Sequence, residues 1–249
     1  MNIFRIFGRG RTPGGGSAAA SIQSVALTHV GLVRAVNEDR VLNLPQANLW
    51  AVADGMGGHH SGDVAAQIAV DVLGDVANQG NTVCGDDILA ALQSANRLIY
   101  ERYANSERRS GTTIVAAFLD EDMLEVFWAG DSRAYLLRAG KWELLTRDHS
   151  VVQQMVDAGA LSLSAAANHP KSNIITRALG VHEEVSIDRV STQFIAGDMV
   201  LLCSDGVSRT FAFELPGAGS TQSFAQSMLD QALTRDGNDN ASLILIVAN

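Results

Sequence analysis

The 249-residue sequence lacks the features that mark several classes of protein. It holds two cysteines, too few for a framework of disulfides. Cys203 lies within an apolar run, so we expect it to be a buried free thiol of a protein in a reducing compartment. No uncharged apolar stretch reaches the roughly 20 residues needed to span a bilayer. We therefore expect a cytoplasmic protein with no stable membrane insertion.

Basic residues are also scarce. The chain has 18 Lys and Arg against 27 Asp and Glu, a net charge of −9. Because neutralising phosphates requires clustered Lys and Arg, we expect no nucleic-acid partner. The excess of carboxylates is compatible with cation binding or with plain solubility. Hydrophobic residues make up 47% and charged residues 18%, which is ordinary for a globular protein and excludes a disordered or fibrous one.

The first 20 residues differ from the rest of the chain. Residues 1–20 are rich in glycine and carry arginines beside a short apolar run at 3–7. We expect a flexible N-terminal tail, with a weak membrane or partner anchor as the alternative. Residues 21–249 contain no repeat and no further break in composition, so they are expected to form one domain.

Hydrophobic periodicity predicts two helices and eight strands in this domain. Apolar residues recur with helical spacing over 64–76 and 88–99. Runs of strand character lie at 24–27, 40–44, 49–53, 113–119, 123–128, 134–137, 199–203 and 242–247. Short connections at 119–123 and 137–141 require antiparallel hairpins. Clustered strands with segregated helices indicate an α+β fold, and strands apolar on both faces favour two antiparallel sheets flanked by helices.

Aspartates stand at the ends of these strands. Asp54 and Asp205 follow strands, whereas Asp39 and Asp239 precede strands. Since such ends alternate along one edge of an antiparallel sheet, the four carboxylates are expected to converge there. Asp131 lies in the turn between two further strands and is expected to join them.

Converging carboxylates favour a hard cation. They repel one another unless a cation neutralises them, and oxygen ligands without a Cys/His cluster suit Mg²⁺ or Mn²⁺ rather than zinc. Two such ions activate a water and stabilise in-line displacement at phosphorus. The alternative is that Asp54-Gly55 and Asp205-Gly206 are simply turn dipeptides. From spacing alone, both interpretations stay open.

Strings of residues resemble the motifs of one family. In family order, residues 28–39, 54–63, 110–113, 130–135, 146–150, 169–170, 175–180, 204–206 and 239–240 resemble the metal-dependent protein phosphatases of the 2C (PPM) family, bacterial Ser/Thr branch. The resemblance covers about 22–247. It implies a four-layer α-β-β-α sandwich with a binuclear Mn²⁺ or Mg²⁺ centre. It also implies that a metal-bridging hydroxide attacks phosphoserine or phosphothreonine in proteins, reversing a bacterial Ser/Thr kinase.

The resemblance implies roles for individual residues. Asp39 matches the carboxylate that bridges both ions, and Asp54 matches a ligand of the first. The carbonyl of Gly55, together with Asp205 and Asp239, matches the ligands of the second.

Further roles lie around these ligands. Glu38 matches a carboxylate that acts through metal-bound water, and Arg34 matches the arginine that grips the substrate phosphate. Asp131 matches a ligand of a third, weaker ion, shared with Asp205. Met56 stands where some members carry a histidine proposed as general acid, and Met56 cannot donate a proton. Residues 149–176 resemble the flap beside the active site.

Two other functions compete with an active phosphoprotein phosphatase. One is a phosphatase-like regulatory module that binds partners without turnover, and the other is a small-molecule phosphoesterase on the same scaffold. A module without turnover would usually have lost a metal carboxylate, whereas all four are present here.

Overall fold

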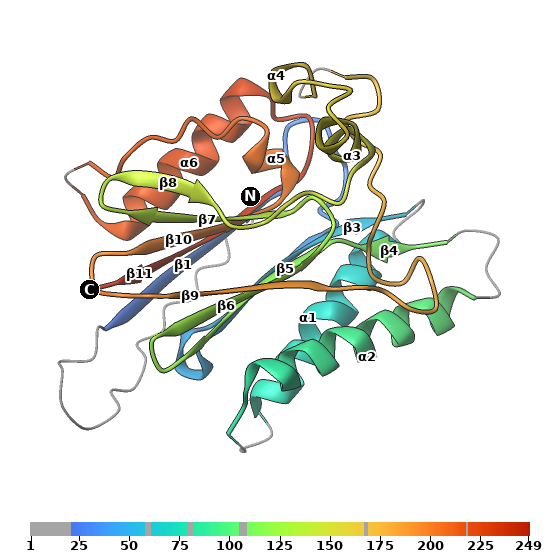
Figure 1. Cartoon of the computed structure of the whole chain (residues 1–249), viewed down its shortest axis with the longest axis horizontal. Helices are drawn as coiled ribbons and strands as arrows, with labels where there is room; N and C mark the ends of the chain where they lie inside the picture. The colour runs from blue at the N-terminus through green and yellow to red at the C-terminus, as the bar shows by residue number, and fades with distance from the viewer. Residues whose placement is uncertain (1–20, 58–60, 79–81, 105–108, 167–168, 218) are drawn as a thin grey trace.

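The computed structural model describes residues 21–57, 61–78, 82–104, 109–166, 169–217 and 219–249. The predicted tail at 1–20 lies outside these ranges, and so do His59 and His60. Two antiparallel sheets stack face to face, with helices on both outer sides (Figure 1). The four-layer α+β sandwich expected from the sequence is therefore confirmed.

The first sheet has the strand order β2-β3-β5-β6-β9, with the short β4 paired to β3. Its strands are β2 (Asp39–Leu44), β3 (Leu49–Met56), β4 (Gly111–Thr112), β5 (Ile114–Asp120), β6 (Met123–Ala129) and β9 (Asp188–Gln193). A 3-10 turn, η1 (Pro45–Ala47), joins β2 to β3. In the β2–β3 register Asp39 lies directly opposite Asp54.

The second sheet has the order β1-β11-β10-β7-β8. Its strands are β1 (Ile22–His29), β7 (Arg133–Arg138), β8 (Lys141–Leu144), β10 (Met199–Cys203) and β11 (Ala241–Ala248). Strand β11 pairs with both β1 and β10, which brings the first and last strands of the domain side by side.

Three apolar clusters hold the layers together. Between the sheets, Trp50 and Val115 of the first sheet share a fully buried cluster with Leu202 and Ile244 of the second. The first sheet packs its outer face on α1 (Gly62–Asn78) and α2 (Gly85–Tyr103). The second packs on α6 (Thr221–Arg235). Because both faces of each sheet are covered, most strands are apolar on nearly every position.

The described part of the chain also holds three short helices: α3 (Val151–Asp157), α4 (Leu163–Ala166) and α5 (Asp205–Ser208). None of the helices in the described ranges combines the length and apolar character needed to cross a bilayer. Cys203 is buried and not in a disulfide, as the sequence predicted, and Cys84 is an exposed free thiol.

All eight predicted strands and both predicted helices form, but the periodicity misses α6, β9, the short strands β4 and β8, and the short helices α3, α4 and α5. Helix α6 buries a narrow stripe in which Ala225 and Ala232 alternate with larger residues, so its apolar signal is weak. Strand β9 lies at the edge of its sheet and half of its positions are exposed. Its polar sequence therefore reads as a loop.

Candidate metal centre

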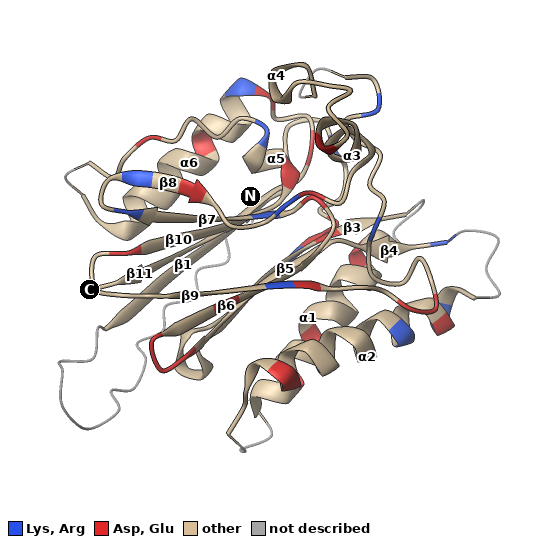
Figure 2. Cartoon of the chain, viewed as in Figure 1, with Lys and Arg blue, Asp and Glu red and all other residues tan. Residues whose placement is uncertain are grey.

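Four aspartates expected to converge do meet at one end of the sandwich. Asp39 and Asp54 lie opposite each other on β2 and β3, Asp205 is the first residue of α5 directly after β10, and Asp239 precedes β11. The expectation that they share one sheet edge is wrong. Each sheet contributes one pair, because β2 and β3 belong to the first sheet and β10 and β11 to the second. Figure 2 shows acidic segments at the start of α5 and toward the end of β3.

A cavity of about 270 Å³ opens between these strand ends. Its lining includes most of the residues that the sequence singled out, and it also receives residues from the loop at 173–175. The residues that line the cavity are Arg34, Glu38, Asp54, Gly55, Met56, Gly57, Thr113, Asp131, Asn173, Ile175, Asp205, Arg209, Asp239 and Asn240. Asp39 is 2% exposed and lies against this group through its pairing with Asp54.

Two glycines make the convergence possible. A Cβ on Gly55 would lie 2.2 Å from the carbonyl oxygen of Gly62, so β3 approaches the start of α1 more closely than any side chain allows. A Cβ on Gly206 would lie 2.0 Å from the carbonyl oxygen of Asn240. Each glycine directly follows a cavity aspartate. The Asp-Gly dipeptides therefore serve close backbone approach at the cavity, beyond any role as plain turns.

The carboxylate of Asp39 is only partly satisfied by hydrogen bonds. Its Oδ2 accepts a hydrogen bond of 2.9 Å from the Ser204 hydroxyl, whereas its Oδ1 is buried and has no hydrogen-bond partner. Burial, reinforced by repulsion from Asp205 and Asp239, raises the pKa of Asp39 to about 7. A buried oxygen without a partner is costly, so this geometry favours a cation beside Asp39.

In Asp54, Asp205 and Asp131 the charged form of the carboxylate is also disfavoured. Burial and the charges of Asp39 and Asp205 raise the pKa of Asp54 well above its ordinary value. Burial also raises the pKa of Asp205, although the Arg209 charge opposes that shift. The pKa of Asp131 rises to about 7 through burial and the charge of Asp205. Such a set of desolvated oxygen donors suits a hard divalent cation.

Two arginines hold two of these carboxylates. Arg34 grips Asp239 with two contacts, Nε to Oδ1 and Nη2 to Oδ2, both at 3.0 Å. Arg209 pairs with Oδ2 of Asp205. In the described ranges no three acidic, histidine or cysteine side chains are drawn together as a complete ligand set. The residues present fit a divalent cation by donor type and burial, with Asp205 and Asp239 turned toward arginines.

Sequence reasoning missed the residue that fixes the approach to the cavity. The Asn240 amide donates to the carbonyl oxygens of Val30 and Val36, at 2.8 and 2.9 Å, and its Oδ1 accepts from the backbone of Glu38 at 2.8 Å. It thereby ties the loop that carries Arg34 to the start of β11. The only signal was its place after Asp239, in a string that matched the family motif.

The turn that carries Asp131 is held by a neighbouring histidine. The backbone N–H of Gly130 donates to Nδ1 of His149 at 3.1 Å, and the imidazole stacks on Trp128 with ring centroids 6.1 Å apart. On the other side, the hydroxyls of Thr113 and Ser132 lie 2.8 Å apart. These contacts place Asp131 at the cavity from the turn between β6 and β7.

The segment 149–176 closes back on itself at its base. Ser150 forms a β-bridge with Ile175, and the Thr176 backbone donates to the carbonyl of His149 at 2.7 Å. Asn173 and Ile175 both line the cavity. Its position beside the cavity fits the predicted flap, whose role in substrate choice stays a prediction.

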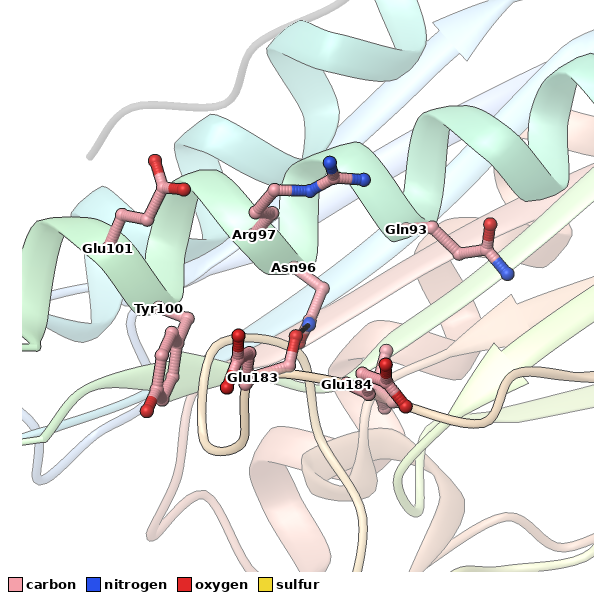
Figure 3. Close-up of a pocket in the computed structure, with 8 residues that line it drawn as sticks. Gln93, Asn96, Arg97, Tyr100, Glu101, Glu183 and Glu184 are labelled. Carbon is pink, nitrogen blue, oxygen red and sulfur yellow. Dashed lines mark hydrogen bonds between the residues drawn. The ribbon is translucent and has the colours of Figure 1, made fainter.

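A larger cavity of about 510 Å³ lies between α2 and the loop at 183–185 (Figure 3). Asn96 lines this cavity, and both its amide nitrogen and its amide oxygen form hydrogen bonds. Its amide donates to the carbonyls of His182 and Glu183, at 3.2 and 2.9 Å, and its Oδ1 accepts from Gly180 at 2.7 Å. This cavity therefore marks where α2 anchors a loop. The smaller cavity is the candidate functional site, because the carboxylates with raised pKa values line it.

Comparison with known proteins identifies the family of this arrangement. A family model described as "Protein phosphatase 2C" matches residues 33–243. The "Serine/threonine phosphatase stp" of Listeria welshimeri serovar 6b is 34% identical over 238 residues, covering 89% of this chain and 94% of that protein.

Solved structures agree with the sequence matches. The serine/threonine phosphatase of S. agalactiae superposes with a TM-score of 0.85 at 31% identity, covering 92% of this chain and 100% of that one. The catalytic domain of the phosphatase PstP, solved in complex with two manganese ions, superposes with a TM-score of 0.81 at 32% identity, covering 91% and 97%.

Proposed function

The chain belongs to the protein phosphatase 2C family, and from that premise we propose that it hydrolyses phosphoserine and phosphothreonine in proteins in a metal-dependent reaction. The observation that carries the proposal is Asp39: a buried carboxylate with one oxygen unpartnered, facing the repulsion of Asp205 and Asp239. A divalent cation resolves that conflict.

We assign the ligands as follows. Asp39 would bridge two Mn²⁺ or Mg²⁺ ions, Asp54 would bind the first, and Asp205, Asp239 and the carbonyl of Gly55 would bind the second. When bound, such ions supply an activated water at neutral pH and neutralise charge on the phosphoryl group. The manganese-bound phosphatase PstP supports this assignment as a relative with the same fold.

The residues around the ligands position the substrate. Arg34 is about half exposed at the cavity, and its planar fork already holds a carboxylate with two contacts. The same fork suits two oxygens of a phosphate, so Arg34 would exchange Asp239 for the substrate. Glu38 lines the cavity, and we assign it to orienting water at the ions. Met56 cannot protonate the serine or threonine oxygen as it leaves phosphorus, so that proton must come from solvent or another group.

Asp131 would hold a third and weaker ion together with Asp205. Both line the cavity, and burial together with the charge of Asp205 raises the pKa of Asp131 to about 7. A site with fewer protein carboxylates binds a hard cation less tightly.

The cellular setting follows from the chemistry. Substrates that carry phosphoserine or phosphothreonine require a Ser/Thr kinase to form them, and we propose that this chain reverses such a kinase in the cytoplasm. Two free thiols, one of them exposed, support a reducing compartment.

The deciding experiment is phosphopeptide turnover by the full chain with manganese, before and after chelation. We expect activity that chelation abolishes and manganese restores. A parallel panel of sugar phosphates tests the small-molecule alternative, and preference for that panel would replace the proposal. Manganese binding without turnover of either substrate would indicate a regulatory module.

A further inference from the structure

Arg209 lies beside Asp205 at the cavity, and no motif in the sequence predicted a role for it. It follows α5 directly, four residues after Asp205, and its guanidinium pairs with Oδ2 of Asp205. It lines the same cavity as Asp131. A fixed positive charge therefore lies where two carboxylates were expected to share a cation.

The charge of Arg209 acts on both carboxylates. Burial raises the pKa of Asp131 and of Asp205, and in each case the guanidinium opposes the shift. Asp148, the other acidic neighbour of Asp131, is already taken by Arg133, whose Nε and Nη2 donate to it at 2.8 and 2.7 Å. Arg209 is thus the cation available to Asp131 and Asp205 together.

We propose that Arg209 is a built-in counter-cation of the Asp131–Asp205 pair, which competes with a third divalent ion and sets how weakly that ion binds. The inference rests on the proposed function, since the pair was assigned there to a third ion. The third ion would then bind weakly for two reasons: Arg209 competes with it, and few protein carboxylates hold it.

The arrangement allows the exchange that competition requires. The Arg209 side chain is 36% exposed, and its partner is one turn of helix away on the same segment. When a divalent ion takes Oδ2 of Asp205, the guanidinium has a path into solvent without unfolding any element. A divalent ion carries twice the charge of the guanidinium, so at millimolar concentration it can replace Arg209 at the Asp205 carboxylate.

Manganese titration of the full chain tests the proposal. We compare the parent with Arg209→Gln, Arg209→Lys and the double variant Arg209→Gln/Asp131→Asn, counting bound ions by the spin-resonance signal of free Mn²⁺. Exposed Arg102 on α2 supplies the matched control, since Arg102 does not line the cavity and Arg102→Gln removes the same charge.

We expect two tight ions in every variant and a third, weak ion whose affinity differs. Removing one charge beside the pair should tighten the weak site about tenfold in Arg209→Gln. Arg209→Lys and Arg102→Gln should match the parent, and the double variant should lose the third ion. In metal-stripped protein, Arg209→Gln should melt below the parent, and manganese should restore most of the difference.

Two results would overturn the proposal. One is a weak site of parental affinity in Arg209→Gln. The other is a raised KM for phosphopeptide in Arg209→Gln with the manganese titration unchanged, which would make Arg209 a substrate contact. Because ion counting needs no turnover, it decides the role of Arg209 even if the parent proves inactive on phosphopeptides.

Discussion

The two sheets bring unlike carboxylate pairs to the same cavity. Asp39 of the first sheet is buried, Asp54 opposite it is partly exposed at the cavity, and neither forms a salt bridge within the described ranges. Asp205 and Asp239, from the second sheet, each pair with an arginine. Both pairs consist of carboxylates, but only the second pair has arginine partners that supply a counter-charge.

This difference separates a permanent requirement from an adjustable one. A buried carboxylate that faces a second carboxylate without a basic partner is costly unless a cation joins it, so the first pair favours a bound metal ion. A carboxylate held by an arginine at the surface can exchange that partner for an ion or release it to a phosphate. The roles proposed for Arg209 and Arg34 therefore place the adjustment of affinity for ions and for substrate at the second pair.

The largest expected effect comes from breaking the first pair. Asp39→Ala should lower kcat by at least about a hundredfold, because the ions lose the carboxylate that bridges them. The metal-stripped protein should melt no lower than the parent, since one member of a repelling cluster is gone. Phosphopeptide turnover and thermal melting measure the two effects.

The control for that change is Asp120→Ala, which removes an exposed carboxylate at the end of β5. It should leave both readouts at parental values. Full manganese-dependent activity in folded Asp39→Ala protein would show that Asp39 does not hold the ions.

A smaller effect is expected at the second pair. Arg34→Ala should raise KM for phosphopeptide about tenfold with a lesser change in kcat, because its contact with phosphate exists in the ground state as well as the transition state. Steady-state kinetics measure the split, with Arg102→Ala as the matched loss of charge. An unchanged KM would assign Arg34 to its ion pair with Asp239 alone.

The smallest effect is a pH dependence of stability in metal-stripped protein. The pKa of Asp39 and of Asp131 is raised from 3.8 to about 7 in the folded chain. The folded state thus keeps protons that the unfolded state releases, so stability is greatest below about pH 4 for these groups and is lost as pH rises through about 7. Melting temperatures measured between pH 5 and pH 8 should fall.

Manganese should remove most of that slope, because the ions take the place of the protons. Asp39→Asn should flatten it in metal-stripped protein. A melting temperature that rises from pH 5 to pH 8 without metal would mean that the carboxylates are better compensated than their burial indicates.

Local patterns were enough for most of the fold. Continuous apolar runs predicted strands covered on both faces, and helical spacing predicted α1 and α2, because each of these elements buries a broad apolar surface. The polar edge strand β9 and the narrow stripe of α6 gave no such signal. Those two elements are recognised only in the structure, where β9 pairs with β6 and α6 packs on the second sheet.

The site divides in the same way. The sequence by itself determined which aspartates stand at strand ends, since alternation and turn residues are local properties, and motif order indicated their chemistry. Only the tertiary structure decided that the pairs come from different sheets and that Asn240 ties the Arg34 loop to β11. These facts depend on how two sheets stack, and the pairing of distant side chains leaves no periodic trace in the chain.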